Sequence, residues 1–350
     1  MRLLKSTLIS SLIALSLVPL SQTHACTRVV YQGPENNILT GRSMDFSIEI
    51  PANLWVFPRG MSRNGEVGKN SIEWTSRYGS LVTSSWDIAT TDGMNEKGLV
   101  ANLLWLVESQ YPAFEKDGDQ PGLTIAAWAQ YALDNFATVN EAVSALAKEE
   151  FAVVTDFIPG TDKFTTVHLS LSDATGDNAI FEYIEGKLVI HHNRNYNVMT
   201  NDPVFEQQLA IKGYWENIPG TIMLPGSNRA SDRFVRASYY VNAIPQTTDP
   251  QISVASLFSV IRNVSVPYGI STPDQPHISN TRWRVVADQN RLVYYYESVL
   301  TPNTVWVDLN KLDFSPNASV KKLALDAGQI YAGESSKHFK ASKPFVFQGL

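Results

Sequence analysis

The chain contains one cysteine in 350 residues, Cys26, and this single thiol limits how the protein is built. No disulfide can cross-link the fold, and no zinc site made from several cysteines is available. The composition, 44% hydrophobic and 18% charged, is typical of a folded globular chain and not of a disordered one. A lone cysteine is either inert or reactive, and the segment in front of Cys26 bears on that choice.

Residues 1–25 have the pattern of a secretory signal peptide. The pattern consists of two early cations, an apolar run and two small residues ahead of a cleavage site: Arg2, Lys5, residues 8–20, Thr23 and Ala25. The apolar run is shorter than the ~20 residues that span a bilayer, so a permanent anchor is the weaker interpretation and we expect no stable membrane span after processing. Cleavage between Ala25 and Cys26 predicts a periplasmic or secreted protein that begins with the cysteine.

A lipoprotein would also begin with cysteine, acylated on its sulfur. That processing prefers Leu three residues before the cysteine, where this chain has Thr23. Lipidation would block both the sulfur and the amine, and would favour a non-catalytic, lipid-anchored ligand-binding protein. The intact mass of the exported protein separates these alternatives.

An N-terminal cysteine carries a nucleophile and a base on one residue. A free α-amino group has a pKa of about 7.7–8.0, so it accepts protons near neutral pH. A thiol with a pKa of about 8.5 is already a strong nucleophile. The sequence therefore favours a reactive Cys26, although an exposed terminal cysteine of no consequence remains the alternative.

Other functional classes find less support. Lys and Arg total 28 against 34 Asp and Glu, and loss of Arg2 and Lys5 leaves 26 basic residues and a net charge of −8. Without a basic cluster, nucleic acid is an unfavourable partner. The histidines lack metal-ligand spacing, and His191-His192 reads more readily as surface than as a metal site. No phosphate-binding glycine loop or G-x-S-x-G motif is present, and we expect neither a metal nor an organic cofactor.

Hydrophobic periodicity predicts strands and helices in alternating groups. The expected strands are 26–31, 37–44, 54–57, 80–84, 98–106, 164–171, 179–183, 187–190, 284–287, 292–297 and 304–307. The expected helices are 123–136, a second one opened by the capping box of residues 138–141, 232–241 and 252–264. This order predicts an α+β protein with helices covering its sheets, and a single domain over residues 26–350 after the signal peptide.

Six short motifs, in order behind Cys26, resemble the choloylglycine hydrolase family of N-terminal-nucleophile hydrolases. They are Cys26-Thr27-Arg28, Gly41 to Asp45, Thr91 to Leu99, Met199 to Pro203, Leu224-Pro225-Gly226 with Ser231 to Arg236, and Thr281-Arg282-Trp283. The family contains penicillin V acylases and conjugated bile salt hydrolases. The resemblance implies a four-layer αββα sandwich and acyl transfer without metal or cofactor, and it raises the prospect of a homotetramer.

The resemblance also implies roles for individual residues. Cys26 is the expected nucleophile, its amine the proton acceptor, and Arg42 the cation that favours its thiolate. Asp45 is expected to orient the amine, while Asn201 and the backbone N–H of Trp105 would stabilise the oxyanion. Arg233 matches a late active-site arginine. A surface salt bridge for Arg42 and an ion pair at a helix start for Arg233 are the structural alternatives.

The substrate is predicted from two aromatic residues. Trp105 at the oxyanion position resembles Gram-negative penicillin V acylases, which often also cleave long-chain acyl homoserine lactones. Phe46 departs from the Trp that the resemblance to such acylases implies there, so we expect an acyl pocket of different shape. Both residues suit a phenoxyacetyl ring or a fatty acyl chain, or are plain core. A conjugated bile salt is the alternative substrate.

Overall fold

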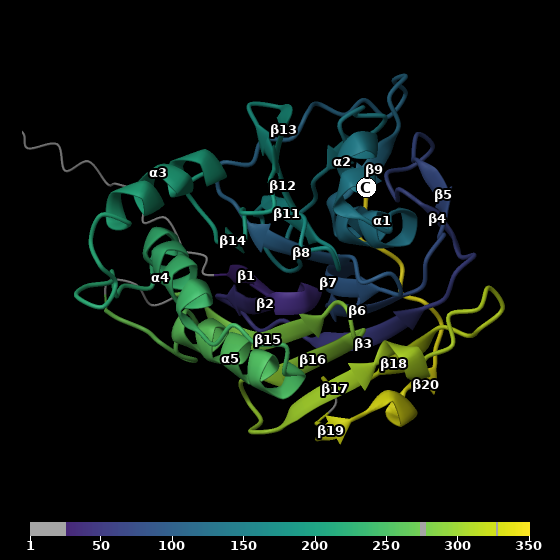
Figure 1. Ribbon diagram of the computed structural model, residues 1–350. Coiled ribbons are helices and arrows are strands. Elements are labelled where there is room, and N and C mark those ends of the chain that lie inside the picture. Colours follow the sequence, from purple (N-terminus) through teal and green to yellow (C-terminus); the bar gives the residue numbers. More distant parts are fainter. Residues whose placement is uncertain (1–25, 274–277, 327) are drawn as a thin grey trace, which may run out of the picture.

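The computed structural model describes residues 26–273, 278–326 and 328–350, which form four layers. Two large sheets pack face to face, and helices cover the outer face of each (Figure 1). The expected signal peptide, residues 1–25, lies outside the described residues. The αββα sandwich predicted from the sequence is therefore confirmed.

The first sheet contains seven strands in the order β14-β1-β2-β15-β16-β17-β19. Its strands are β1 (Thr27–Gly33), β2 (Asn37–Phe46), β14 (Val198–Met199), β15 (Asn280–Asp288), β16 (Val293–Ser298), β17 (Thr304–Asp308) and β19 (Gly333–Glu334). Strands β1 and β2 are antiparallel, with Thr27 opposite Ser43 and Arg28 opposite Arg42. This register brings the residue before β1, Cys26, to the last residues of β2.

The second sheet contains nine strands in the order β13-β12-β11-β8-β7-β6-β3-β18-β20. Its strands are β3 (Ala52–Phe57), β6 (Ser80–Ser85), β7 (Ala89–Asn95), β8 (Val100–Trp105), β11 (Val167–Ser172), β12 (Asn178–Ile184), β13 (Lys187–His192), β18 (Lys321–Leu323) and β20 (Lys340–Ala341). Two small sheets pair β4 (Ser62–Asn64) with β5 (Glu73–Thr75), and β9 (Gly122–Thr124) with β10 (Ala152–Val154).

Helices close the sandwich on both sides. The helices are α1 (Trp128–Asn135), α2 (Val139–Leu146), α3 (Phe205–Trp215), α4 (Ala230–Ala243) and α5 (Pro250–Asn263). Helix α1 packs on β7 and β8, whereas α4 packs on β1 and α5 on β2 and β15. The contact with α5 is close, because a Cβ on Gly41 would lie 2.8 Å from the side chain of Ile261.

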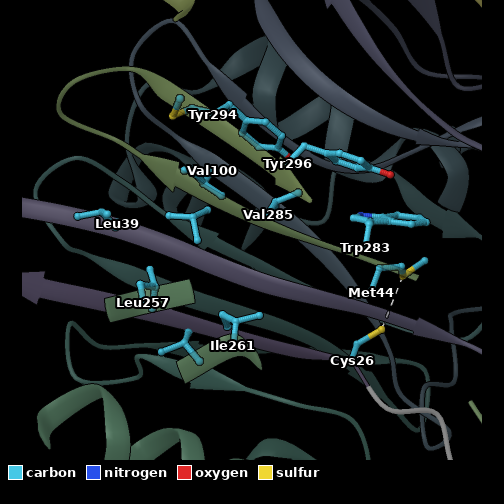
Figure 2. Close-up of a cluster of buried hydrophobic side chains, with 14 of the residues drawn as sticks. Cys26, Leu39, Met44, Val100, Leu257, Ile261, Trp283, Val285, Tyr294 and Tyr296 are labelled. Atoms are coloured by element: carbon cyan, nitrogen blue, oxygen red, sulfur yellow. Dashed lines mark hydrogen bonds between the residues drawn. The ribbon is translucent and has the colours of Figure 1, made fainter. Parts of the chain in front are cut away.

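The core between the sheets ends at the cysteine. Figure 2 shows aliphatic and aromatic side chains, such as Val285 and Tyr294, that fill this region, with Cys26 and Met44 together at one end. The two sulfur atoms lie 3.7 Å apart. Burial of this surface is the main favourable contribution to the stability of a chain that has no disulfide.

One expectation about local structure is wrong. Residues 123–136 do not form one helix, because Leu123 belongs to β9 and pairs with Val153, and α1 starts only at Trp128. Tertiary strand pairing overrides the helical periodicity there. Helix α3 and strand β7 were not expected. The expected N-cap is confirmed, since Thr138 Oγ1 accepts from Glu141 N at 3.2 Å, while the Glu141 carboxylate accepts from Ala137 N at 2.8 Å and not from Thr138 N.

Candidate active site

Cys26 is buried directly ahead of β1, with its side chain among groups from β2. Its sulfur accepts from the backbone N–H of Asp45 at 3.4 Å and from Arg42 Nη2 at 3.6 Å. Only 3% of the residue is exposed, and it lines a cavity between the two sheets. Burial raises the pKa of the Cys26 thiol, and the Arg42 guanidinium opposes that rise.

Alternation along β2 sends its side chains to two environments. Arg42, Met44 and Phe46 share the face that lines the cavity. Asp45 points to the opposite face, where the positive charge of Arg233 from α4 acts on it. Burial raises the pKa of Asp45 to about 6, although the charges of Arg233 and Arg42 favour its ionised form.

Arg42 is held in place by a buried ion pair. Its Nη1 contacts Asp92 of β7, and both side chains are fully inaccessible to solvent. Nη2 also donates to the carbonyl of Leu103 at 2.9 Å. Burial disfavours the charged guanidinium, but Asp92 raises the pKa of Arg42, so the cation persists beside Cys26. The alternative of a surface salt bridge for Arg42 is wrong.

Arg233 joins the cysteine to Asn201. Its Nη1 donates to the Cys26 carbonyl and to Thr27 Oγ1, each at 2.6 Å, and its Nη2 donates to Asn201 Oδ1 at 2.9 Å. Asn201 Nδ2 in turn donates to the Trp105 carbonyl at 2.7 Å. An amide nitrogen carries two hydrogens, so this contact employs one of the two N–H donors of Asn201. The side chain of Arg233 is therefore part of this buried network, not of an ion pair at the helix surface.

The cavity beside Cys26 has a volume of about 120 Å³ and is walled mainly by apolar side chains. Phe46 packs edge-on against Trp86 and Trp105, with ring centroids 6.2 and 6.4 Å apart. Phe46 and Trp105 therefore both line the cavity, as a substrate-binding role requires. An aromatic wall of this kind favours an apolar ligand group.

Trp86 reaches the cavity from a strained turn. Trp86 and Asp87 both have φ of 52°, and Ile88 N donates to Ser85 O at 3.1 Å. A two-residue turn with positive φ at both central positions favours Asn-Gly there, because most other residues are strained at positive φ. The Asp87 carboxylate compensates by accepting hydrogen bonds from several neighbours, among them Trp55 Nε1 at 2.7 Å. Strained residues often cluster at functional sites.

Sequence reasoning missed the groups that support the site. Asp92 lay in a quoted motif but received no role. His168 was not assigned either, yet its Nε2 lies 2.8 Å from the carbonyl of Thr200, the residue before Asn201, and its Nδ1 lies 2.9 Å from Glu182. Burial disfavours the Glu182 carboxylate, but hydrogen bonds from His168 and a second histidine lower its pKa to about 2. The signal available in the sequence was a charged residue, Glu182, inside the apolar strand pattern of residues 179–183.

The described ranges contain neither a candidate metal centre nor a helix that could span a membrane. Outside residues 1–25, 274–277 and 327, no group of three or more His, Cys, Asp or Glu side chains is arranged to hold a metal ion. Over the same part of the chain, no helix is long and apolar enough to cross a membrane.

Two sheets packed between helical layers, with a cysteine directly before an interior strand, define the architecture of the N-terminal-nucleophile hydrolases. Residues 26–323 match the family model described as linear amide C-N hydrolases, choloylglycine hydrolase family. The chain belongs to this family, as the sequence motifs predicted, and is a linear amide C–N hydrolase.

Individual members of the family differ in how similar they are to this chain. The chain is 51% identical to a penicillin V acylase of Pectobacterium atrosepticum, over 97% of this chain and 98% of the relative. The structure of a penicillin V acylase from Agrobacterium tumefaciens superposes with a TM-score of 0.87 at 60% identity, covering 93% of this chain and 100% of that one. A bile salt hydrolase/transferase of Clostridium perfringens is 25% identical over 83% of this chain and 94% of its own length.

Proposed function

We propose that this protein is a periplasmic or secreted penicillin V acylase that also cleaves long-chain acyl homoserine lactones, with Cys26 as its nucleophile. The observation that carries the proposal is the position of the Cys26 thiol, 3.6 Å from a buried arginine and at the wall of an apolar cavity. In this proposal residues 1–25 are removed after Ala25, and residues 26–350 form one catalytic domain.

The reaction begins when the Cys26 sulfur attacks the amide carbonyl carbon of the substrate. The α-amine of the processed Cys26 takes the thiol proton and passes it to the leaving nitrogen as the C–N bond breaks. Water, deprotonated by the same amine, then hydrolyses the thioester and restores the thiol. Arg42 supports the thiolate, because burial alone would keep the sulfur protonated.

Three other groups stabilise the tetrahedral intermediate or the amine. Asn201 donates a side-chain N–H to the oxyanion, and the backbone N–H of Trp105 is the second donor in this proposal. Such donors each contribute about 2.7–4 kcal/mol where they have been removed. Asp45 orients the amine from the opposite face of β2. Arg233 fixes Asn201 relative to Cys26 through its hydrogen bonds to both residues.

The acyl group of the substrate occupies the aromatic cavity. Phe46, Trp86 and Trp105 offer flat apolar surfaces to a phenoxyacetyl ring or a fatty acyl chain. Identity of 51% to a penicillin V acylase, against 25% to a bile salt hydrolase/transferase, favours these groups over a steroid.

The test compares amine release by the mature protein from penicillin V, a long-chain acyl homoserine lactone and glycine-conjugated cholate. Faster release from the first two is the expected result, and fastest release from the bile salt would assign the alternative substrate. Intact mass of the exported protein checks cleavage after Ala25 and excludes acylation of Cys26. Its native mass in solution checks the homotetramer that the family resemblance implies.

A further inference from the structure

Gln348 forms hydrogen bonds to three separate segments of the cavity wall. Its side-chain amide donates to Asp156 Oδ2 at 2.9 Å and to the Phe157 carbonyl at 2.7 Å. Its backbone N–H donates to the Ile88 carbonyl at 2.9 Å, and its carbonyl accepts from Thr124 Oγ1 at 2.5 Å. All five residues line the cavity that contains Cys26.

The three segments lie far apart in the sequence. Ile88 follows the strained turn before β7, Thr124 ends β9, and Asp156 and Phe157 follow β10. One residue from a distant part of the chain thus connects the turn before β7 with the paired strands β9 and β10 and with the loop that follows β10. The Cys26 side chain is held separately, by β2.

The segment that carries Gln348 is itself firmly anchored. Phe345 and Phe347 are buried, and the Phe345 ring lies 5.3 Å from that of Trp55 and 5.5 Å from that of Phe57. Because this aromatic cluster lies on the second sheet, Gln348 has a fixed base from which to position the loop. Its hydrogen bonds are not those of a freely moving chain end.

The loop that Gln348 contacts presents aromatic surface to the outside. Phe157 and Phe164 stack with ring centroids 4.3 Å apart, and 43% and 53% of these residues are exposed. Ile158 N donates to Lys163 O at 2.8 Å, so residues 157–164 form a compact loop. Phe157 also lines the cavity, so this loop forms part of the wall between the cavity and solvent.

We propose that Gln348 is a positioning residue that determines which acyl groups the cavity accepts, by fixing the Phe157 wall. The inference rests on the proposed function, since it assigns the cavity to the acyl group. Acyl groups long enough to reach Phe157 depend on this wall, whereas short ones contact only the aromatic residues beside Cys26. Glutamine is required because its amide supplies two N–H donors, whereas glutamate of the same shape supplies none and adds a negative charge beside Asp156.

The experiment compares the mature protein with Gln348→Glu and Gln348→Ala. Gln246→Glu is the matched control, because the Gln246 amide also donates to backbone carbonyls, those of Val241 and Ile244, but does not line the cavity. For acyl homoserine lactones of increasing chain length, we expect the KM of long chains to rise about tenfold in both Gln348 variants. In the Gln348 variants, kcat and the KM of short chains should stay within about twofold of wild type. All kinetic constants of Gln246→Glu should stay within the same range.

Hydrogen–deuterium exchange gives a readout that does not depend on turnover. Residues 155–165, which the Gln348 side chain holds, should exchange faster in both Gln348 variants. Residues 86–89 are bound through the backbone of residue 348, so they and residues 26–33 should keep their protection, and the control should match wild type. Unchanged exchange in residues 155–165, or faster exchange there with unchanged chain-length selectivity, overturns the inference. If wild type hydrolyses none of the amides, the proposed function fails, and the affinity for free decanoic acid decides instead. Weaker binding by the Gln348 variants then supports the inference, and equal binding refutes it.

Discussion

The two sheets contribute different chemistry to the same cavity. The seven-stranded sheet supplies Cys26 and Arg42, which are buried and bound by short-range polar contacts. The nine-stranded sheet and its turns supply aromatic surface, including Trp86 and Trp105. Polar groups must be held at fixed distances, and an interior strand with paired neighbours provides that rigidity. An apolar wall needs only shape, so it can be built from turns and loops.

Two contacts connect the polar groups and the aromatic wall across the two sheets. Asp92 of the nine-stranded sheet pairs with Arg42, and Phe46 of the seven-stranded sheet extends the aromatic wall. If polar groups carry out the reaction and aromatic groups bind the substrate, substitutions at polar positions should lower kcat, and those at aromatic positions should raise KM. The following changes test this from the largest expected effect to the smallest.

Arg42→Met should lower kcat/KM for penicillin V by about 10³-fold, because the thiolate of Cys26 loses its adjacent cation. It should also lower the free energy of unfolding by about 3–5 kcal/mol, since Asp92 becomes an uncompensated buried charge. Steady-state kinetics and denaturant unfolding measure the two effects. The double variant Arg42→Met/Asp92→Asn should recover much of the stability but none of the activity. Recovered activity in the double variant would show that Arg42 acts only through folding.

Asn201→Ala should lower kcat by about 10²-fold with little change in KM, because the lost contact forms in the transition state. Arg233→Lys provides the comparison, since lysine keeps the charge but cannot donate to Cys26 and Asn201 at once in the same geometry. We expect its kcat to fall as well, by a smaller factor. A rise in KM without a fall in kcat would place Asn201 in substrate binding.

Phe46→Leu should raise the KM for penicillin V by about tenfold and leave kcat nearly unchanged, because it removes aromatic surface and not a reacting group. Phe46→Trp tests the departure from the penicillin V acylase pattern directly and should change the preference among acyl groups. Phe258→Leu, in a helix outside the cavity, is the control for loss of an aromatic core residue. Equal kinetic effects of the two leucine variants would contradict a binding role for Phe46.

Glu182→Gln should have the smallest effect on turnover and a pH-dependent effect on stability. The pKa of Glu182 is lowered to about 2, so its carboxylate stabilises the fold above its unfolded pKa, and this contribution is lost as the pH falls through the folded value. At pH 7 the variant should be less stable by about 2–3 kcal/mol, and the difference should narrow as the pH falls from about 4.3 towards 2. Unfolding measured across this range checks the prediction. A constant difference would assign the effect to packing.

Much of the fold was accessible from the sequence because strand alternation and helix periodicity are local signals. The strands around Arg42 and the helix around Arg233 were predicted close to their observed bounds. Helix α3 was not predicted, because its apolar residues do not gather on one face, and the start of α1 was not, because the pairing of β9 with β10 decides it. Phe46 and Trp105 were placed in one pocket by resemblance, and the structure brings them together.

The contacts that support the site could not be predicted from the sequence, for the same physical reason. The pairing of Arg42 with Asp92, the contact of His168 with Thr200 and the hydrogen bonds of Gln348 each join segments that are far apart in the sequence. No local pattern records such a contact. The packing of one sheet on the other brings the first two pairs together, and the packing of Phe345 on β3 of the nine-stranded sheet brings Gln348 to its partners.

The most direct test of the account is the mass of the mature protein quenched during turnover of penicillin V. We predict a fraction that is heavier by one phenoxyacetyl group, located on the peptide that begins with Cys26 and absent from Cys26→Ala. The alanine variant should keep the fold, by circular dichroism, and lose amine release. Turnover by Cys26→Ala, or an acyl group on any other residue, would contradict the central claim that Cys26 is the nucleophile of this cavity.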